Sequence, residues 1–416
     1  MHLLSQPFNG QLGENLKEHL QSRKFDRLNI SVAFAKNSGV LRLKKELEEF
    51  RKAGGEIRLF VGVDMNVTSY EALINLLPLA SNLYVIHDEN GQTFHSKVFS
   101  FSGPREGLLI IGSHNLTGGG LWTNFESSIH TELDFNDPNH IQLQKSVDSY
   151  FNQLASLGGS VMAITDAATI DNLLIHSYVE KEVRAHVKKA TQDTSPPKKT
   201  RLFSSGRRAT LPPLGRFPTM SPASNADDSK TPQEQIPAPP ISLETNSDAT
   251  LWLETRRMTG GSRNILDLSK TSLLRKGTVR GTPYEHPNPN FMRGAVEFFG
   301  IASDDTDSTK KITINFDGVD YFGNTILFPT GENANGTWRV QIHGVSKNGD
   351  KITSAFSEKA QDGYLLPEKI VCFSRIEADY FYLSVFDASE LPRFISSSTV
   401  TAYNGRTARA RLLGIL

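Results

Sequence analysis

One stretch in the first third of the chain constrains both fold and chemistry, because strand-like apolar runs there end in polar residues that suit a phosphate group. His95 offers a ring nitrogen as a nucleophile. Lys97 lies two residues further on, so in a strand it points to the same face and supplies positive charge. Ser113 and Asn115, again two residues apart, can donate hydrogen bonds to phosphate oxygens. Glu126 is suited to hold the far imidazole nitrogen and fix its tautomer.

The spacing of these residues resembles the signature of the phospholipase D superfamily. It reads His95-Ser96-Lys97, then Gly112-Ser113-His114-Asn115, followed by a glycine run. The usual signature has an Asp about five residues after the Lys, and this chain has Ser102 there. That departure resembles the metal-independent restriction-endonuclease branch (BfiI and NgoFVII type), which has the His-x-Lys, Asn and downstream Glu without the Asp.

The resemblance implies a DNA endonuclease that hydrolyses phosphodiester bonds through a phosphohistidine, with His95, Lys97, Ser113, Asn115 and Glu126 as its catalytic residues. No cofactor or metal is expected, and Asp64 and Glu71 do not form a recognisable metal pair. The predicted catalytic domain, residues 1–186, has a single His-x-Lys, so a site that needs two histidines implies a homodimer formed through the catalytic domain. The expected substrate is double-stranded DNA.

Two alternatives stay open at this point. One is a phospholipase D-type lipid phosphodiesterase or transferase using the same histidine chemistry. The other is a DNA-binding subunit of a defence complex, working with a methyltransferase or helicase partner. The single motif and Ser102 argue against the lipid enzyme.

Alternating strand and helix patterns predict the fold around the motif. Strands are expected over 28–35, 56–63, 83–86, 97–101 and 108–111. Between the first two, Val40, Leu43, Leu47 and Phe50 recur at helical spacing, and Gly54-Gly55 ends that helix. Thr68 and Glu71 form a capping-box pattern before the next helix. Residues 1–186 are therefore predicted to form an α/β phospholipase D-like domain, a mixed sheet flanked by helices.

The remainder of the chain changes character twice. Residues 187–248 are rich in Ser, Pro and basic residues with little apolar periodicity, which predicts a flexible linker. Residues 249–416 contain short alternating runs separated by Gly and Asn turns, which predicts a β-rich domain. By analogy with the restriction branch, it is expected to be a pseudobarrel that recognises DNA. The candidate base-contacting residues there are Arg256, Arg263, Asn264 and Arg280.

Composition narrows the location and the cofactor classes. The formal net charge is +0, which argues neither for nor against nucleic acid. Cys372 is the single cysteine, so disulfides within the chain and thiolate metal clusters are impossible. No run approaches the roughly 20 apolar residues that span a bilayer, and the N-terminus lacks a signal pattern. A cytoplasmic protein that does not bind membranes is expected.

Overall fold

The computed structural model describes residues 1–192, 209–215, 249–258, 262–331, 335–360 and 364–416. Within them, the N-terminal region contains an eight-stranded mixed sheet. In spatial order its strands are β1 (His2–Gln6), β7 (Glu126–Asp134), β6 (Glu106–Gly112), β5 (Lys97–Ser102), β2 (Arg27–Val32), β3 (Glu56–Gly62), β4 (Asn82–Ile86) and β8 (Val161–Ile164). β2, β3 and β4 are parallel, and the other neighbours pair antiparallel.

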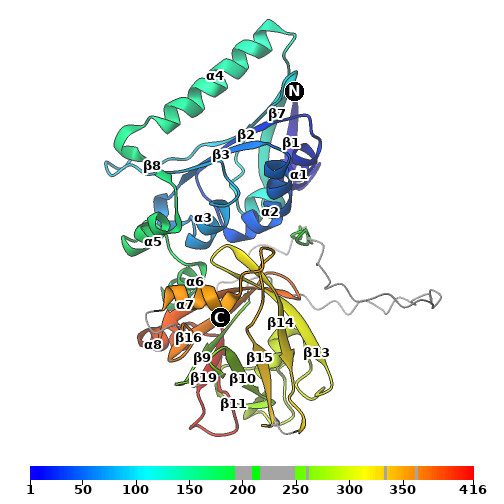
Figure 1. The fold of residues 1–416 in the computed structure, drawn as a ribbon, viewed down its shortest axis with the longest axis vertical. Coiled ribbons are helices and arrows are strands. Elements are labelled where there is room, and N and C mark those ends of the chain that lie inside the picture. The colour runs from blue at the N-terminus through cyan, green and yellow to red at the C-terminus, as the bar shows by residue number, and fades with distance from the viewer. Residues whose placement is uncertain (193–208, 216–248, 259–261, 332–334, 361–363) are drawn as a thin grey trace, which may run out of the picture.

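Helices cover both faces of this sheet (Figure 1). α1 (Leu12–Gln21), α2 (Asn37–Lys52) and α3 (Tyr70–Leu76) lie on one face, and α4 (Pro138–Ala155) lies across the other. Strand β3 shows why both faces are covered: Ile57 and Leu59 join the core under α1–α3, whereas Phe60 joins the core under α4. The predicted α/β class, a mixed sheet flanked by helices, is confirmed.

The helix predicted from apolar spacing is α2. Val40, Leu43, Leu47 and Phe50 are all buried against the sheet, as their spacing predicts. Gly54, just beyond the helix, has a φ of +93°, a left-handed conformation that glycine adopts without a steric penalty.

The capping box predicted at Thr68 and Glu71 is wrong by one residue. Ser69 caps α3 by accepting a hydrogen bond from the backbone N–H of Ala72 at 3.2 Å. The Thr68 hydroxyl is occupied elsewhere, donating to the Gly62 carbonyl at 2.6 Å. Glu71 is buried and accepts from the backbone N–H of Glu182. Thr68 and Glu71, which the local pattern assigned to the cap, therefore form hydrogen bonds with residues outside the helix instead.

The C-terminal region is β-rich. In the part that the structure describes, an eleven-stranded sheet is almost entirely antiparallel, with β13 and β17 pairing in parallel. In spatial order its strands are β10 (Ile265–Ser269), β15 (Thr337–Gln341), β14 (Val319–Leu327), β13 (Thr309–Phe316), β17 (Tyr380–Asp387), β16 (Lys369–Arg375), β9 (Thr250–Glu254), β19 (Leu412–Ile415), β18 (Val400–Tyr403), β11 (Thr271–Lys276) and β12 (Phe291–Arg293). The predicted β-rich character is confirmed, and the pseudobarrel stays a prediction.

Helices and one segment of the expected linker connect the two regions. α5 (Ala167–Ile175) leads to α6 (Glu182–Gln192), whose Val183 and Val187 are buried with Trp252 and with Phe394 of α8 (Leu391–Ser397). α7 (Ile352–Lys359) lies close to α6 in Figure 1. Residues 209–215 run past α2, where Arg42 donates to the Pro212 carbonyl at 3.0 Å. The rest of the expected linker, 193–208 and 216–248, lies outside the described residues, and the domain boundaries stay predictions.

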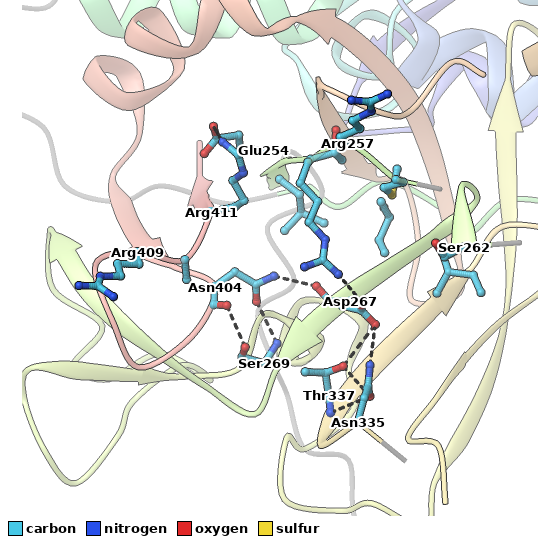
Figure 2. A pocket seen from close by; sticks show the side chains of 17 residues that line it. Glu254, Arg257, Ser262, Asp267, Ser269, Asn335, Thr337, Asn404, Arg409 and Arg411 are labelled. Carbon is cyan, nitrogen blue, oxygen red and sulfur yellow. Dashed lines mark hydrogen bonds and ion pairs between the residues drawn. The ribbon is translucent and has the colours of Figure 1, made fainter. Parts of the chain in front are cut away.

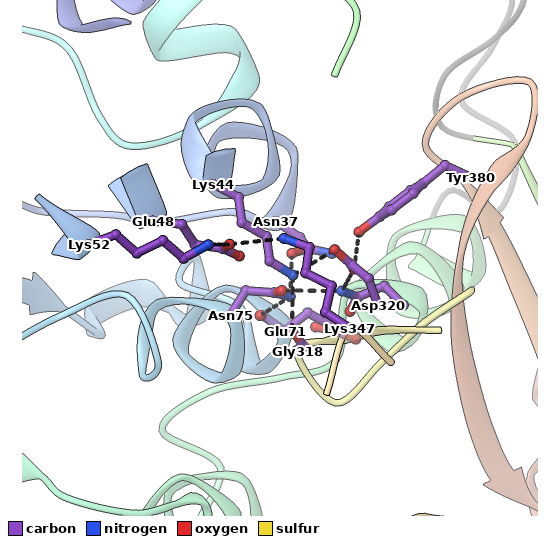
Figure 3. Close-up of polar contacts among 11 residues, drawn as sticks. Asn37, Lys44, Glu48, Lys52, Glu71, Asn75, Gly318, Asp320, Lys347 and Tyr380 are labelled. Atoms are coloured by element: carbon purple, nitrogen blue, oxygen red, sulfur yellow. Dashed lines mark hydrogen bonds and ion pairs between the residues drawn. The ribbon is translucent and has the colours of Figure 1, made fainter. Parts of the chain in front are cut away.

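A buried polar cluster joins α2 and α3 to the C-terminal sheet (Figure 3). Lys44 of α2 donates to the Asp320 carboxylate and to the Gly318 carbonyl, both at 3.0 Å. Its side chain is 7% exposed and that of Asp320 is 8% exposed. Tyr380 and Asn315 also donate to Asp320. An ion pair and several hydrogen bonds therefore replace the hydration that the Asp320 carboxylate loses on burial.

We expect Lys44→Met to destabilise the protein by about 3–5 kcal/mol, because it leaves Asp320 buried and unpaired. Denaturant unfolding followed by fluorescence measures the loss. Lys347→Met is the matched control, since Lys347 pairs with Glu48 at 3.1 Å at the exposed rim of the same interface. It should cost less than about 1 kcal/mol. Equal effects of the two substitutions would contradict this account.

Glu71 makes stability depend on pH. Burial, and then the neighbouring carboxylate of Glu182, raise the pKa of Glu71 above its ordinary value of 4.5. The folded protein therefore holds a proton that the unfolded chain releases above about pH 4.5, so stability falls as pH rises from there through neutrality. Glu71→Gln should flatten this fall in urea unfolding measured from pH 5 to pH 8. A wild-type protein that grows more stable over that range, with the variant following it, would disprove the assignment.

Candidate active site

The topology gathers the predicted residues at one edge of the N-terminal sheet. Lys97 begins β5 and pairs with Val32 at the end of β2. β6 runs antiparallel to β5, so its last residue, Gly112, lies at the same edge and pairs with Ser128 near the start of β7. The insertion of β5, β6 and β7 beside the parallel strands thus brings distant segments to one place.

His95 and Lys97 form the centre of this edge. The Lys97 ammonium lies 2.7 Å from His95 Nδ1 and donates to the His95 carbonyl at 2.9 Å. The His95 ring is exposed, and the edge of the Phe34 ring packs against it at 5.8 Å between centroids. Lys97 is buried, and this burial lowers the pKa of its ammonium. A weakly hydrated cation therefore lies directly beside a solvent-facing imidazole.

The Lys97 contact assigns the tautomer of His95. A protonated Lys97 can only donate, so Nδ1 of the neutral ring accepts and the ring proton is on Nε2. A phosphate oxygen that accepted a hydrogen bond from Lys97 would compete for the ammonium and release the Nδ1 lone pair.

Glu126 contacts Ser113 rather than His95. Ser113 Oγ donates to one oxygen of the Glu126 carboxylate, and Asn124 Nδ2 donates to the other at 3.3 Å. Among the described residues, no hydrogen bond joins Glu126 to His95, so the expected contact with the imidazole is not made. The reason is the pairing of β6 with β7, which places Ser113 next to the first residues of β7. Glu126 still acts on Lys97 through space, opposing the lowering of the pKa of that ammonium.

Asn115 is tied to the same edge through Phe34. Its Oδ1 accepts from the Phe34 backbone N–H at 3.0 Å, and the Phe34 ring in turn contacts His95. Its Nδ2 makes no hydrogen bond to other described residues and is a donor open to a ligand. The glycine run is needed here, because a Cβ on Gly120 would lie 2.5 Å from the Asn115 carbonyl oxygen.

Asp64 supports the site, although the sequence did not single it out for that role. One oxygen of its carboxylate accepts from the backbone N–H of Phe94, immediately before His95, at 2.7 Å. The other lies 2.6 Å from Nδ1 of His87. Asp64 follows the buried strand β3 at the edge that carries His95. A polar residue directly after a buried strand was the signal available in the sequence.

His114, inside the motif, is a buried structural residue. Its Nδ1 lies 2.8 Å from the Gly120 carbonyl and its Nε2 lies 3.1 Å from the Ser128 hydroxyl. Burial lowers the pKa of His114, so the ring is neutral and bridges the glycine run to β7. His130, which contacts the same Ser128, has a pKa lowered by burial to about 4.

The four candidate base-contacting residues do not all line one cavity of the described residues. The Arg263 guanidinium stacks on the Tyr364 ring at 3.5 Å, and the Asn264 carbonyl accepts from Ile342. Arg280 is exposed on the loop that follows β11. Arg256 lines a cavity in the C-terminal region, and the other three are not among the residues that line it. Their role in DNA binding stays a prediction.

Neither a metal-binding cluster nor a membrane-spanning helix is found among the described residues. No group of three or more His, Cys, Asp or Glu side chains in those ranges is placed to hold a metal ion. Of the helices that the structure describes, none combines the length and apolarity required to cross a bilayer.

No protein-family model matches this chain, and no curated protein does either. Solved structures similar to it include Nuc, a phospholipase D family member from Salmonella typhimurium, at 14% identity over 40% of this chain and 97% of that one. NucT from Helicobacter pylori matches at 14% over 39% and 98%. A polyphosphate kinase from Porphyromonas gingivalis matches at 17% over 40% of this chain and only 24% of its own length. Each TM-score is 0.30, too low to carry an argument, so the chemistry rests on the motif and its geometry.

Proposed function

We propose that this protein is a DNA endonuclease that hydrolyses phosphodiester bonds through a phosphohistidine at His95, without a metal ion. The observation that carries the proposal is the exposed imidazole of His95 held beside the buried ammonium of Lys97. An exposed ring can reach a phosphate, and a poorly hydrated cation next to it neutralises the phosphate oxygens strongly. Asn115 Nδ2 adds a hydrogen-bond donor at the same edge, and the Ser113 hydroxyl adds a second one when its proton turns from Glu126 to the phosphate.

The reaction takes two steps. In the first, a lone pair of the His95 ring forms a bond to phosphorus, the bond to the leaving oxygen breaks, and that oxygen takes a proton from the imidazolium of a second copy's His95. In the second, water attacks phosphorus, the nitrogen–phosphorus bond breaks, and the water proton passes to the second histidine. Both rings are restored. Lys97 and Asn115, with Ser113, stabilise the pentavalent state, and Glu126 orients Ser113.

We propose more specifically that the protein is a restriction-type enzyme whose C-terminal region selects the DNA site. We propose as part of this function that the enzyme works with a methyltransferase or helicase partner. Sequence-selective cleavage would yield discrete fragments from a plasmid of known sequence.

We expect the purified protein to cut plasmid DNA in EDTA, and His95→Ala to lower the rate at least about 10³-fold, because the ring supplies both nucleophile and acid. His176→Ala is the control, since His176 is an exposed histidine at the end of α5. Gel electrophoresis measures cleavage, and labelled phosphatidylcholine tested in parallel would detect the lipid activity. Cleavage that needs added magnesium, or that survives in His95→Ala, would contradict the mechanism.

We further propose that two catalytic domains associate next to this edge. An apolar strip supports this: Leu3, Ile129 and Ile111 lie opposite one another on three neighbouring strands and are 53%, 39% and 51% exposed. Phe8 and Phe125, with ring centroids 5.6 Å apart, are 65% and 70% exposed beside Glu126. Exposed apolar surface of this kind marks contact sites.

Ile129→Glu should convert a dimer into a monomer and abolish cleavage, because it places a charge in the centre of the strip. Light scattering after size exclusion gives the mass. Ile175→Glu, at a 72% exposed position on α5, is the matched control and should leave mass and activity unchanged. A wild-type monomer that cleaves DNA at full rate would refute the shared site.

A further inference from the structure

The C-terminal region contains a cavity of about 640 Å³ that the catalytic site does not use. One wall is the end of β9 and the residues after it, 253–258, and the opposite wall is the loop between β18 and β19, at 404–411 (Figure 2). Strand β10 and the start of β15 form the floor between them.

The polar groups of the floor are already bonded to one another. The Asp267 carboxylate accepts from Asn335 and Thr337 at 3.3 Å, and it pairs with Arg339 at 3.6 Å. Asn404 donates to the Asp267 carbonyl at 2.7 Å and accepts from the Ser269 backbone N–H at 2.9 Å. The polar side chains of the floor therefore already have hydrogen-bond partners, and few of them are left to contact the edge of a base.

The arginines around the floor are different. Arg257 and Arg409 are exposed on opposite walls, where their side chains extend from the rim of the cavity toward solvent (Figure 2). Neither forms an ion pair with any residue that the structure describes. Arg411 is 53% exposed and forms an ion pair with Glu254 at 3.0 Å. Arg256 lies 3.8 Å from Asp267 and is 71% exposed. These four arginines line the cavity with two carboxylates, so its charge is positive.

The loop sequence explains the second wall. Residues 404–411 read NGRTARAR, in which small residues separate arginines at short intervals. Neither a buried strand nor an amphipathic helix accounts for that spacing. It presents guanidinium groups to solvent opposite Arg257.

We propose that this cavity holds the sugar–phosphate backbone of a nucleic-acid strand, clamped by Arg257 on one wall and Arg409 on the other. Guanidinium groups fit phosphate oxygens with two parallel hydrogen bonds, and groups on two walls suit a polyanion that runs between them. Because the floor is internally bonded, the contacts hold DNA irrespective of sequence. The inference rests on the proposed function for its substrate, and it adds a holding site away from the catalytic edge.

The test uses the full chain carrying His95→Ala, so that DNA is bound without being cut. Fluorescence anisotropy of a labelled duplex, titrated at several salt concentrations, gives the affinity and its salt dependence. Arg257→Ala with Arg409→Ala should raise Kd at least about tenfold at moderate salt and reduce the slope of log K against log salt by about 1 for each arginine. The loss should be equal for two duplexes of unrelated sequence.

Two control variants sharpen the result. Arg105→Ala with Arg393→Ala removes the same charge from exposed positions outside the cavity and should leave the slope unchanged. Arg257→Lys with Arg409→Lys keeps the charge and should retain the slope while losing part of the affinity.

A slope and Kd equal to those of the outside control would overturn the proposal. A loss confined to one duplex sequence would do so as well, because it would indicate base reading. Binding of inorganic pyrophosphate that depends on these arginines, with duplex binding unaffected, would reassign the cavity to a small anion. Wild-type protein that binds DNA through these arginines but cuts none would fail the proposed function and leave this site standing.

Discussion

The site depends on one constraint of strand direction. β2, β3 and β4 are parallel, and β5, β6 and β7 continue the same sheet antiparallel to their neighbours. Strands that end and strands that begin therefore meet at a common edge. His95 comes from the connection before β5, and Ser113 and Glu126 lie at the two ends of the connection between β6 and β7. A sheet buried on both faces holds these two connections in place.

At this edge, Lys97 and His95 differ in burial, and their proposed roles differ accordingly. Lys97 is the first residue of a buried strand, so its ammonium is poorly hydrated and interacts strongly with nearby charge. His95 precedes the strand and faces solvent. Asp64, beneath them, fixes the backbone through Phe94. The polar contacts of Asp64 and His114 are internal, which leaves His95, Lys97 and Asn115 to meet a substrate.

The two regions of the chain are held together by charge as well as by apolar contact. The pair of Lys44 and Asp320 lies where α2 meets the C-terminal sheet, and α6 packs its valines against Trp252. This connection places a basic cavity and the candidate catalytic edge in one molecule. The candidate catalytic edge carries His95 and Lys97, and the cavity carries Arg257 and Arg409, which form no ion pair with the described residues. We therefore propose that binding and bond cleavage take place in different parts of the chain.

The local sequence determined the elements and the identity of the motif. The spacing of Val40, Leu43 and Leu47 predicted α2, because periodicity reports which side of an element is buried. The mostly apolar run over 56–63 predicted the buried strand β3. The proximity of His95 and Lys97 also followed from their spacing. Edge strand β1 was not predicted, since its short polar sequence has no clear alternation.

Only the tertiary structure decided which distant groups meet. Glu126 accepts a hydrogen bond from Ser113, and Thr68 donates to the carbonyl of Gly62 at the end of β3. Arg257 and Arg409 lie on different walls of one cavity. Strand register and the approach of two sheets set these contacts, and neither leaves a periodic signal in the chain. The sequence alone therefore determined what chemistry was available, and the fold decided which partner each side chain has.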